Sequence, residues 1–224
     1  MHDAASLRLA HDGAEHLPGA AAALLPDLMA ALADLPSGVP GLRLAGIPQL
    51  TRLLEAGGAV GRVAARNAGV GAKPVRALLF DKSTTANWAL GWHQDRTIAV
   101  EARREIAGFG PWTIKRGMPH VAPPFALLAA MTTLRIHLDD VPADNAPLLI
   151  APGSHRGLVR EHDIDGEVAA RGTCACLAVA GDIWAYATPI LHASEAAARP
   201  VRRRVLQVDY ATGDLPGGLR WLGV

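Results

Sequence analysis

Short apolar segments separated by turn residues fill the chain from residue 73 onward, and this pattern restricts the fold more than any other feature. Such segments lie at 75–81 (VRALLFD), 132–141 (TTLRIHLDDV), 147–157, 173–189 and 201–211 (VRRRVLQVDYA). In 132–141 apolar and polar side chains alternate, as in a strand, and 173–189 is predicted to form two strands joined at Ala180-Gly181. Many short strands are typical of an antiparallel sandwich or barrel. The sequence therefore predicts a mainly β core with flanking helices.

The first seventy residues have a different character, because they are rich in Ala and Leu. Segments 18–36, 47–58 and 59–69 are predicted to be helical, with a kink or break at Pro26. We expect one domain over 1–224, which divides into a helical support region (1–72), the β core (73–212) and a C-terminal tail (213–224). Within the core, segment 96–124 is irregular and is expected to form a helix and a long loop, and long loops are often functional.

Composition and charge exclude several classes of partner. The net charge is +1, and the run of three consecutive arginines in RPVRRRV does not make a basic stripe, so neither nucleic acid nor an anionic membrane is expected. The start of the chain does not resemble a signal peptide, and the apolar segment around Pro26 is too short to span a bilayer. We expect a cytoplasmic protein with a small-molecule substrate.

Cys174 and Cys176, two apart on one strand, are expected to be reduced core residues, with paired metal ligation as the alternative.

His93 and Asp95 are the first candidates for chemistry. They are two apart in NWALGWHQDRTIAV, and on an extended segment such side chains point the same way, so both can reach one metal ion. A second histidine from a facing strand would complete a two-histidine, one-carboxylate iron site, and His192 is suitably distant in the sequence. The spacing alone is not specific, because His137 and Asp139 repeat it.

Arg203 follows His192 on a predicted strand, where it points opposite to Arg202 and Arg204. If Arg203 and His192 flank one cavity, its guanidinium can form a paired hydrogen bond with the carboxylate of a co-substrate.

Three blocks together resemble a known family. The stretches WHQD, DNAPLLIAPGSHRG and GDIWAYATPILHAS…RRRVLQVDY, in this order, are similar to the phytanoyl-CoA dioxygenase family. Its members are Fe(II)- and 2-oxoglutarate-dependent oxygenases with a double-stranded β-helix core, the cupin-like jelly roll. The resemblance covers about residues 75–211. One departure is Ala146, where relatives usually have glycine.

The resemblance implies a set of site residues. By it, the iron ligands are His93, Asp95 and His192. The residues expected at 2-oxoglutarate are Arg203, which pairs with the distal carboxylate, and Ser194, Lys82 and Asn87. The implied activity is hydroxylation of a C–H bond with O2, releasing succinate and CO2. Relatives that halogenate lack the metal-binding carboxylate, so the presence of Asp95 favours hydroxylation.

Other interpretations stay open at this point. Trp88, Trp112 and His120 are candidate substrate contacts, with Lys115 and Arg116 near the same mouth, although a core or solvated role is the alternative for each. The same iron centre can desaturate, epoxidise or cyclise. A non-catalytic jelly roll that binds a ligand or partner is a different class. A cupin-like metal enzyme without a keto acid is a third, but it has no use for Arg203 and Ser194. The substrate is expected to be a small metabolite.

Overall fold

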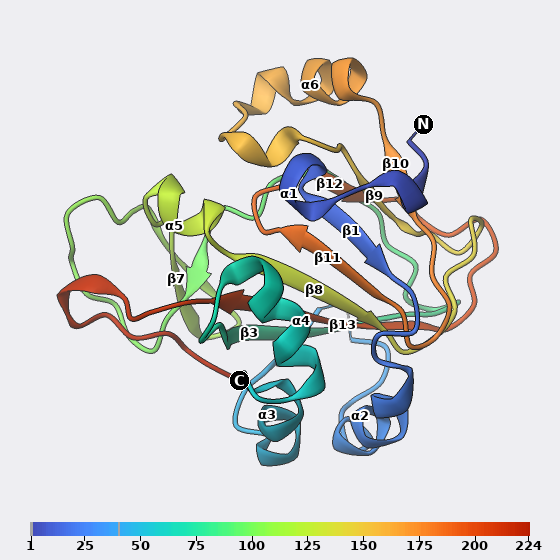
Figure 1. Cartoon of the computed structure of the whole chain (residues 1–224), viewed down its shortest axis with the longest axis horizontal. Coiled ribbons are helices and arrows are strands. Elements are labelled where there is room, and N and C mark those ends of the chain that lie inside the picture. The colour runs from blue at the N-terminus through green and yellow to red at the C-terminus, as the bar shows by residue number, and fades with distance from the viewer. Residues whose placement is uncertain (1, 40) are drawn as a thin grey trace.

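Two antiparallel sheets form the core of the protein, whose computed structural model describes residues 2–39 and 41–224 (Figure 1). The large sheet has the order β1-β11-β8-β13-β3-β2, and the small sheet has the order β10-β9-β12-β4. The strands of the large sheet are β1 (Ala14–Leu17), β2 (Leu42–Leu44), β3 (Lys73–Lys82), β8 (Thr132–His137), β11 (Ile183–Ala187) and β13 (Arg203–Ala211). Those of the small sheet are β4 (Leu90–His93), β9 (Leu148–Ile150), β10 (Cys174–Cys176) and β12 (His192–Ser194).

Four strands of each sheet come from the region after residue 72, as an eight-stranded jelly roll requires. The mainly β prediction is confirmed, and each predicted strand segment contains an observed strand. Segment 173–189 does form two strands, but β10 pairs with β9 in the small sheet while β11 pairs with β8 in the large one. The chain therefore crosses from one sheet to the other at the predicted turn.

The large sheet has an apolar outer face and a polar inner face. On β13, Leu206 and Val208 pack into a core shared with the helices. The alternate residues Arg203 and Gln207 line a cavity between the sheets. At one end of the space between the sheets, a second apolar cluster contains the two buried free cysteines, as expected from the sequence. The polar inner face is what leaves room for a site.

Helices from the N-terminal region cover the outer face of the large sheet (Figure 1). The α-helices are α1 (Leu9–Asp12), α2 (Leu25–Ala31), α3 (Pro48–Leu54), α4 (Ala59–Ala68), α5 (Phe125–Ala129) and α6 (Ile164–Arg171). Short 3-10 helices lie at η1 (Ala4–Ser6), η2 (Ala22–Leu24), η3 (Ser154–Arg156), η4 (Glu161–Asp163) and η5 (Pro216–Gly218). No helix in the described part of the chain combines the length and apolar character needed to cross a membrane.

The N-terminal region is not purely helical, which corrects the prediction for 1–72. Residues 14–17 form β1, which pairs with β11, and residues 42–44 form β2, which pairs with β3. Each strand lies at one edge of the large sheet and satisfies the backbone groups that the neighbouring strand would otherwise expose. Met1 and Pro40, which belong to the same predicted region, lie outside the described residues.

The helix predicted within 96–124 is wrong, although a long loop does lie there, over 100–111. The rest of the segment forms a third sheet of order β5-β7-β6, from β5 (Ile98–Ala99), β6 (Trp112–Lys115) and β7 (Met118–Val121). Strands β6 and β7 are joined by the two residues Arg116 and Gly117, both at positive φ, as in the tight hairpin turns that fit the twist of a β ribbon. The hairpin brings Lys115 and Arg116 to the cavity between the main sheets.

Candidate metal centre and its cavity

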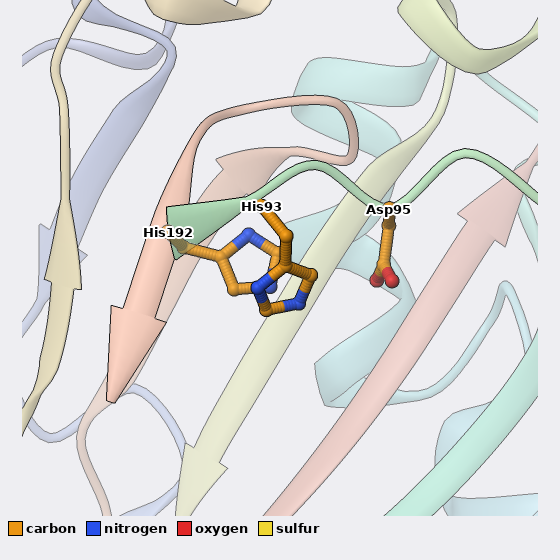
Figure 2. A group of neighbouring side chains, drawn as sticks. All are labelled: His93, Asp95 and His192. Atoms are coloured by element: carbon orange, nitrogen blue, oxygen red, sulfur yellow. The ribbon is translucent and has the colours of Figure 1, made fainter. Parts of the chain in front are cut away.

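His93, Asp95 and His192 come together beside the space between the two sheets. His93 ends β4, His192 begins β12, and the two residues pair directly across these antiparallel strands. Their ring centroids lie 4.2 Å apart, and the candidate ligand atoms of all three residues lie within 4.8 Å of one another. Figure 2 shows the Asp95 carboxylate extending from the loop after β4 to the same side as both imidazoles. Two imidazoles and one carboxylate are the donor set of a facial iron site with open positions.

Each imidazole is oriented by the backbone carbonyl two residues before it. Nδ1 of His93 lies 2.8 Å from the carbonyl oxygen of Gly91, and Nδ1 of His192 lies 3.0 Å from that of Ile190. With Nδ1–H as the donor, Nε2 is the unprotonated atom that a metal binds. Burial, followed by the neighbouring His93, lowers the pKa of His192 to about 4, so this ring is neutral at pH 7.

Arg76 orients the carboxylate of Asp95. Its Nη2 donates to Asp95 Oδ2 at 2.8 Å, and its Nε donates to the buried Asp209. Thr133 Oγ1 also donates to Asp209, at 2.9 Å. Burial would raise the pKa of Asp95, but the charge of Arg76, aided by His192 and His93, outweighs it and holds the pKa well below its usual range. Asp95 is therefore a fixed carboxylate at neutral pH.

Gln94 holds the loop that carries these two ligand candidates. Its side chain is buried, donates to the carbonyls of Gly157 at 2.9 Å and Pro189 at 2.7 Å, and accepts from the Val159 N–H at 2.9 Å. Because Gln94 is anchored on the opposite side of the extended chain, His93 and Asp95 both face the cavity.

The cavity next to this group has a volume of about 260 Å³, and its inner part is cationic. Lys82, Arg135 and Arg203 line it from β3, β8 and β13. Their hydrogen bonds go to neutral groups, among them Lys82 Nζ to Ser194 Oγ at 2.9 Å and Arg135 Nη1 to a glutamine oxygen at 2.9 Å. Burial, followed by Arg203 and Arg135, lowers the pKa of Lys82 to about 8. Within the described chain no carboxylate pairs with these three cations, so the inner cavity carries positive charge without a counterion from the protein.

Arg203 is the most buried of the three cations. Its Nη1 donates to the carbonyl of Ala146, while its Nε is buried without an acceptor among the described residues. Ala146 adopts the left-handed conformation, with φ of 52°, at the position where the family usually has glycine. The turn thus keeps the backbone shape that glycine favours, and its carbonyl faces the guanidinium.

The neighbours of Arg203 point outward, as predicted from strand alternation. They are not merely solvated, however: Arg202 pairs with Asp81 at 3.0 Å and Arg204 pairs with Asp139 at 2.7 Å. The two residues of the second His-x-Asp pattern therefore point in different directions. Asp139 pairs with Arg204 on the outer side of the large sheet, whereas His137 is buried. The group of candidate metal ligands contains neither residue.

The remaining predicted site residues divide between the cavity and its surroundings. Trp88 and Ser194 line the cavity together with Lys82 and Arg203. Trp112 and His120 lie instead in the third sheet, where His120 is fully buried and its Nδ1 contacts the Met118 carbonyl at 2.9 Å. They do not belong to the cavity lining.

Asn87 also lies outside the cavity lining, and its amide binds the backbone of Ala197. Nδ2 donates to the Ala197 carbonyl at 3.0 Å, and Oδ1 accepts from the Ala197 N–H at 2.6 Å. Replacing Asn87 with alanine removes both bonds and is expected to lower the free energy of unfolding by about 1–3 kcal/mol. Urea denaturation measures this loss. An unchanged stability with weakened 2-oxoglutarate binding would contradict the structural role and return Asn87 to the cofactor site.

Arg76, Arg135 and Gln94 are among the residues of the site and its surroundings that were not identified from the sequence. Arg76 lies inside the apolar run VRALLFD, and Arg135 lies on the polar face of an alternating strand. A charged residue within a predicted core strand was the available signal, because such a residue is buried only when it has a partner or a ligand.

Comparison with known proteins agrees with this geometry. The family model for phytanoyl-CoA dioxygenase (PhyH) matches residues 59–205, about two thirds of the chain. The chain belongs to the phytanoyl-CoA dioxygenase family. This is a family of Fe(II)- and 2-oxoglutarate-dependent oxygenases, so membership assigns the chain to that class of oxidoreductase. No curated protein sequence matches the chain.

Solved structures of related fold support the jelly-roll assignment. EctD from S. alaskensis, solved with 2-oxoglutarate and 5-hydroxyectoine, superposes with a TM-score of 0.66 at 18% identity, covering 96% of this chain and 77% of that one. The carbocyclase SnoK from nogalamycin biosynthesis gives 0.63 at 18% identity, with coverage of 95% and 87%. The epimerase SnoN from the same biosynthesis gives 0.63 at 21%, with coverage of 94% and 88%. At this identity the likeness is one of fold.

Proposed function

We propose that this member of the family hydroxylates a C–H bond of a small molecule, with His93, Asp95 and His192 as the iron ligands. When bound, Fe(II) and 2-oxoglutarate supply the oxidation: the keto acid becomes succinate and CO2, and one oxygen atom of O2 enters the C–H bond. The observation that carries the proposal is that the two-histidine, one-carboxylate group lies beside a cavity whose inner cations, Lys82, Arg135 and Arg203, have no carboxylate partner among the described residues.

The residues present fit both groups. The two Nε2 atoms and the Asp95 carboxylate provide the ligands, and their orientation is fixed by the carbonyls of Gly91 and Ile190 and by Arg76. A bound dicarboxylate such as 2-oxoglutarate would neutralise the positive charge of Lys82, Arg135 and Arg203, which have no counterion among the described residues.

Arg203 and its neighbours would hold the keto acid. The buried guanidinium, whose Nε has no acceptor among the described residues, would pair its remaining N–H donors with the distal carboxylate, and arginine is the residue best suited to such bidentate recognition. Lys82 and Ser194 are already hydrogen-bonded to each other and would extend this contact. Trp88 lies beside the Lys82 ammonium and helps to exclude water from this wall.

We also propose that residues 1–224 act as one domain, since α2, α3 and α4 share a core with β3, β8 and β13.

We further propose that the protein is located in the cytoplasm. Support for it comes from the free thiols of Cys174 and Cys176, which a reducing compartment preserves.

Anaerobic titration of the purified protein with Fe(II) and then 2-oxoglutarate tests the assignment. The wild type is expected to develop the visible charge-transfer band of the chelated complex, and His93→Ala is expected to lose it. His137→Ala is the matched control, because it removes the histidine of the other His-x-Asp pattern. A wild type without the band, or a band that survives His93→Ala, would contradict the proposal and favour a non-catalytic binding protein.

A further inference from the structure

The three inner cations leave different donors free for a ligand. Lys82 Nζ donates to the carbonyl oxygens of Trp88 at 2.7 Å and Glu195 at 2.9 Å, and to Ser194 Oγ at 2.9 Å. An ammonium has three N–H donors, so those of Lys82 are all used within the protein. Lys82 therefore adds positive charge to the inner cavity, and the N–H donors for a ligand must come from the two inner arginines.

Arg135 and Arg203 each have a buried donor without a partner. The Nε atoms of both have no acceptor among the described residues, and both side chains are buried. A buried N–H without an acceptor is unfavourable and is uncommon in folded proteins, so each Nε indicates a place for a ligand. Arg203 is the arginine that the resemblance assigns to the distal carboxylate of 2-oxoglutarate, whereas Arg135 is not among the residues that the resemblance implies.

Arg135 lies between Arg203 and the metal centre on the inner face of the large sheet. It is level with Gln207 of the neighbouring β13. Along β13, Gln207 comes four residues after Arg203 and two residues before Asp209. Asp209 belongs to the ion-pair network that orients Asp95. The strand register therefore places Arg135 between the inner end of the cavity and the metal ligands.

The guanidinium of Arg135 extends into the cavity and is held there. Its Cζ lies 5.1 Å from the ring centroid of Phe80, which lines the cavity from β3, two strands away in the sheet. Gln207 Oε1 accepts hydrogen bonds from Arg135 Nη1 at 2.9 Å and from the Tyr186 hydroxyl at 3.3 Å. One oxygen with two donors fixes the orientation of the guanidinium while its Nε stays unpaired.

The charge of Arg135 acts on both ends of the cavity. Burial is the main cause that lowers the pKa of Arg203, and Arg135 adds to this decrease. Burial and His93 lower the pKa of His192, and Arg135 adds to that decrease as well. A keto acid whose distal carboxylate is bound at Arg203 must pass this guanidinium to reach the metal ligands. Its other carboxylate, next to the keto group, is then the anionic group that Arg135 can meet.

We infer that Arg135 binds the carboxylate next to the keto group of 2-oxoglutarate, while Arg203 binds the distal carboxylate. The inference rests on the proposed function and adds one binding residue to that site. Each carboxylate of the co-substrate thus has its own guanidinium, and hydrogen bonds between such groups are stronger than those between neutral groups.

Two keto acids distinguish the roles of the two arginines. 2-Oxoglutarate has both carboxylates, whereas 2-oxopentanoate has the same chain length but lacks the distal carboxylate. Titration of the charge-transfer band, under anaerobic conditions with Fe(II), gives the dissociation constant of each. Arg135→Gln is expected to raise the dissociation constants of both keto acids about ten- to a hundredfold, because it removes hydrogen bonds to a charged group. Arg203→Ala is expected to weaken the binding of 2-oxoglutarate alone.

The position of the band is a second readout, and it uses 2-oxoglutarate only. At saturation, Arg135→Gln is expected to shift the band maximum, because it alters a contact of the chelating carboxylate, and Arg203→Ala is expected to leave the maximum unchanged. Arg135→Lys keeps the charge without the planar fork and is expected to bind with intermediate affinity, so it replaces Arg135→Gln if that variant does not fold. Arg204→Gln is the matched control, because Arg204 pairs with Asp139 on the outer side of the sheet.

The outcomes separate this inference from the proposed function. If Arg135→Gln binds both keto acids as the wild type does and leaves the band maximum in place, the inference is overturned while the oxygenase assignment stands. If Arg135→Gln weakens 2-oxoglutarate alone without moving the band, Arg135 acts at the distal carboxylate, and the inference is also overturned. A wild type without the band contradicts the proposed function and the assignment of Arg135 with it.

Discussion

Replacing Arg203 with alanine is expected to weaken 2-oxoglutarate binding by roughly 30-fold to several thousand-fold. Truncating one partner of a buried, hydrogen-bonded charge pair costs about 2–5 kcal/mol, because the other charge is left without a counterion. Arg203 is fully enclosed, and the inner cavity has no described carboxylate that would compete with the ligand. Titration of the charge-transfer band with 2-oxoglutarate gives the dissociation constant directly.

The same substitution is not expected to destabilise the protein without ligand. Burial, followed by Arg135, lowers the pKa of Arg203, so the folded protein holds this charge at a cost. Arg203→Ala removes that cost together with one bond to the Ala146 carbonyl. A large loss of affinity with little loss of stability is the signature of a binding residue, whereas equal losses in both would mark Arg203 as structural.

Arg202→Ala is the control for charge. It removes the same positive charge one residue earlier, but from a half-exposed side chain that pairs with Asp81 on the outer side. Its effect on 2-oxoglutarate binding is expected to stay within about threefold, because exposed charges are screened by solvent. A similar loss in both variants would mean that overall charge, and not the position of Arg203, controls affinity.

The sequence predicted those parts of the fold that depend on local pattern. Alternation located β8 and β13 and the inward direction of Arg203, and the spacing of His93 and Asp95 placed both on one side of an extended chain. His192 followed from its place before the arginine-rich strand. The predictions for β8, β13, Arg203 and the His93–Asp95 pair depend on strand periodicity, which is a property of a few consecutive residues, whereas His192 was assigned from its place in the chain and from the family resemblance.

The parts that were missed depend on distant partners. Strands β1 and β2 are short, and the sequence AEHL has no strand pattern of its own, so the pairing comes from the free edges of β11 and β3. In 96–124, the tight turn at Arg116-Gly117 is a local signal for a hairpin, and the prediction of a helix and a long loop overlooked it. Gln94 was missed because its three backbone partners lie in loops far along the chain.

Arg76 is the clearest case of a long-range contact with a large expected effect. It separates two carboxylates, Asp95 and Asp209, and Asp209 is 133 residues away in the sequence. Arg76→Met keeps most of the side-chain volume but leaves both carboxylates without their cation. Breaking a buried ion pair in this way is expected to lower the free energy of unfolding by about 3–5 kcal/mol, measured by urea denaturation of the metal-free protein. Arg220→Met, at the exposed pair with Glu101, is the control and is expected to lose at most about 1 kcal/mol.

A second substitution distinguishes loss of charge balance from loss of packing. In Arg76→Met with Asp209→Asn, one unpaired negative charge is removed while the amide can still accept the hydrogen bond from Thr133, so part of the lost stability should return. Iron affinity should not return with it, because Asp95 still lacks the group that orients it, and such losses typically weaken metal binding 10- to 100-fold. If the double variant is no more stable than Arg76→Met, packing and not charge explains the loss. If it regains both stability and iron affinity, Asp95 is oriented by something other than Arg76.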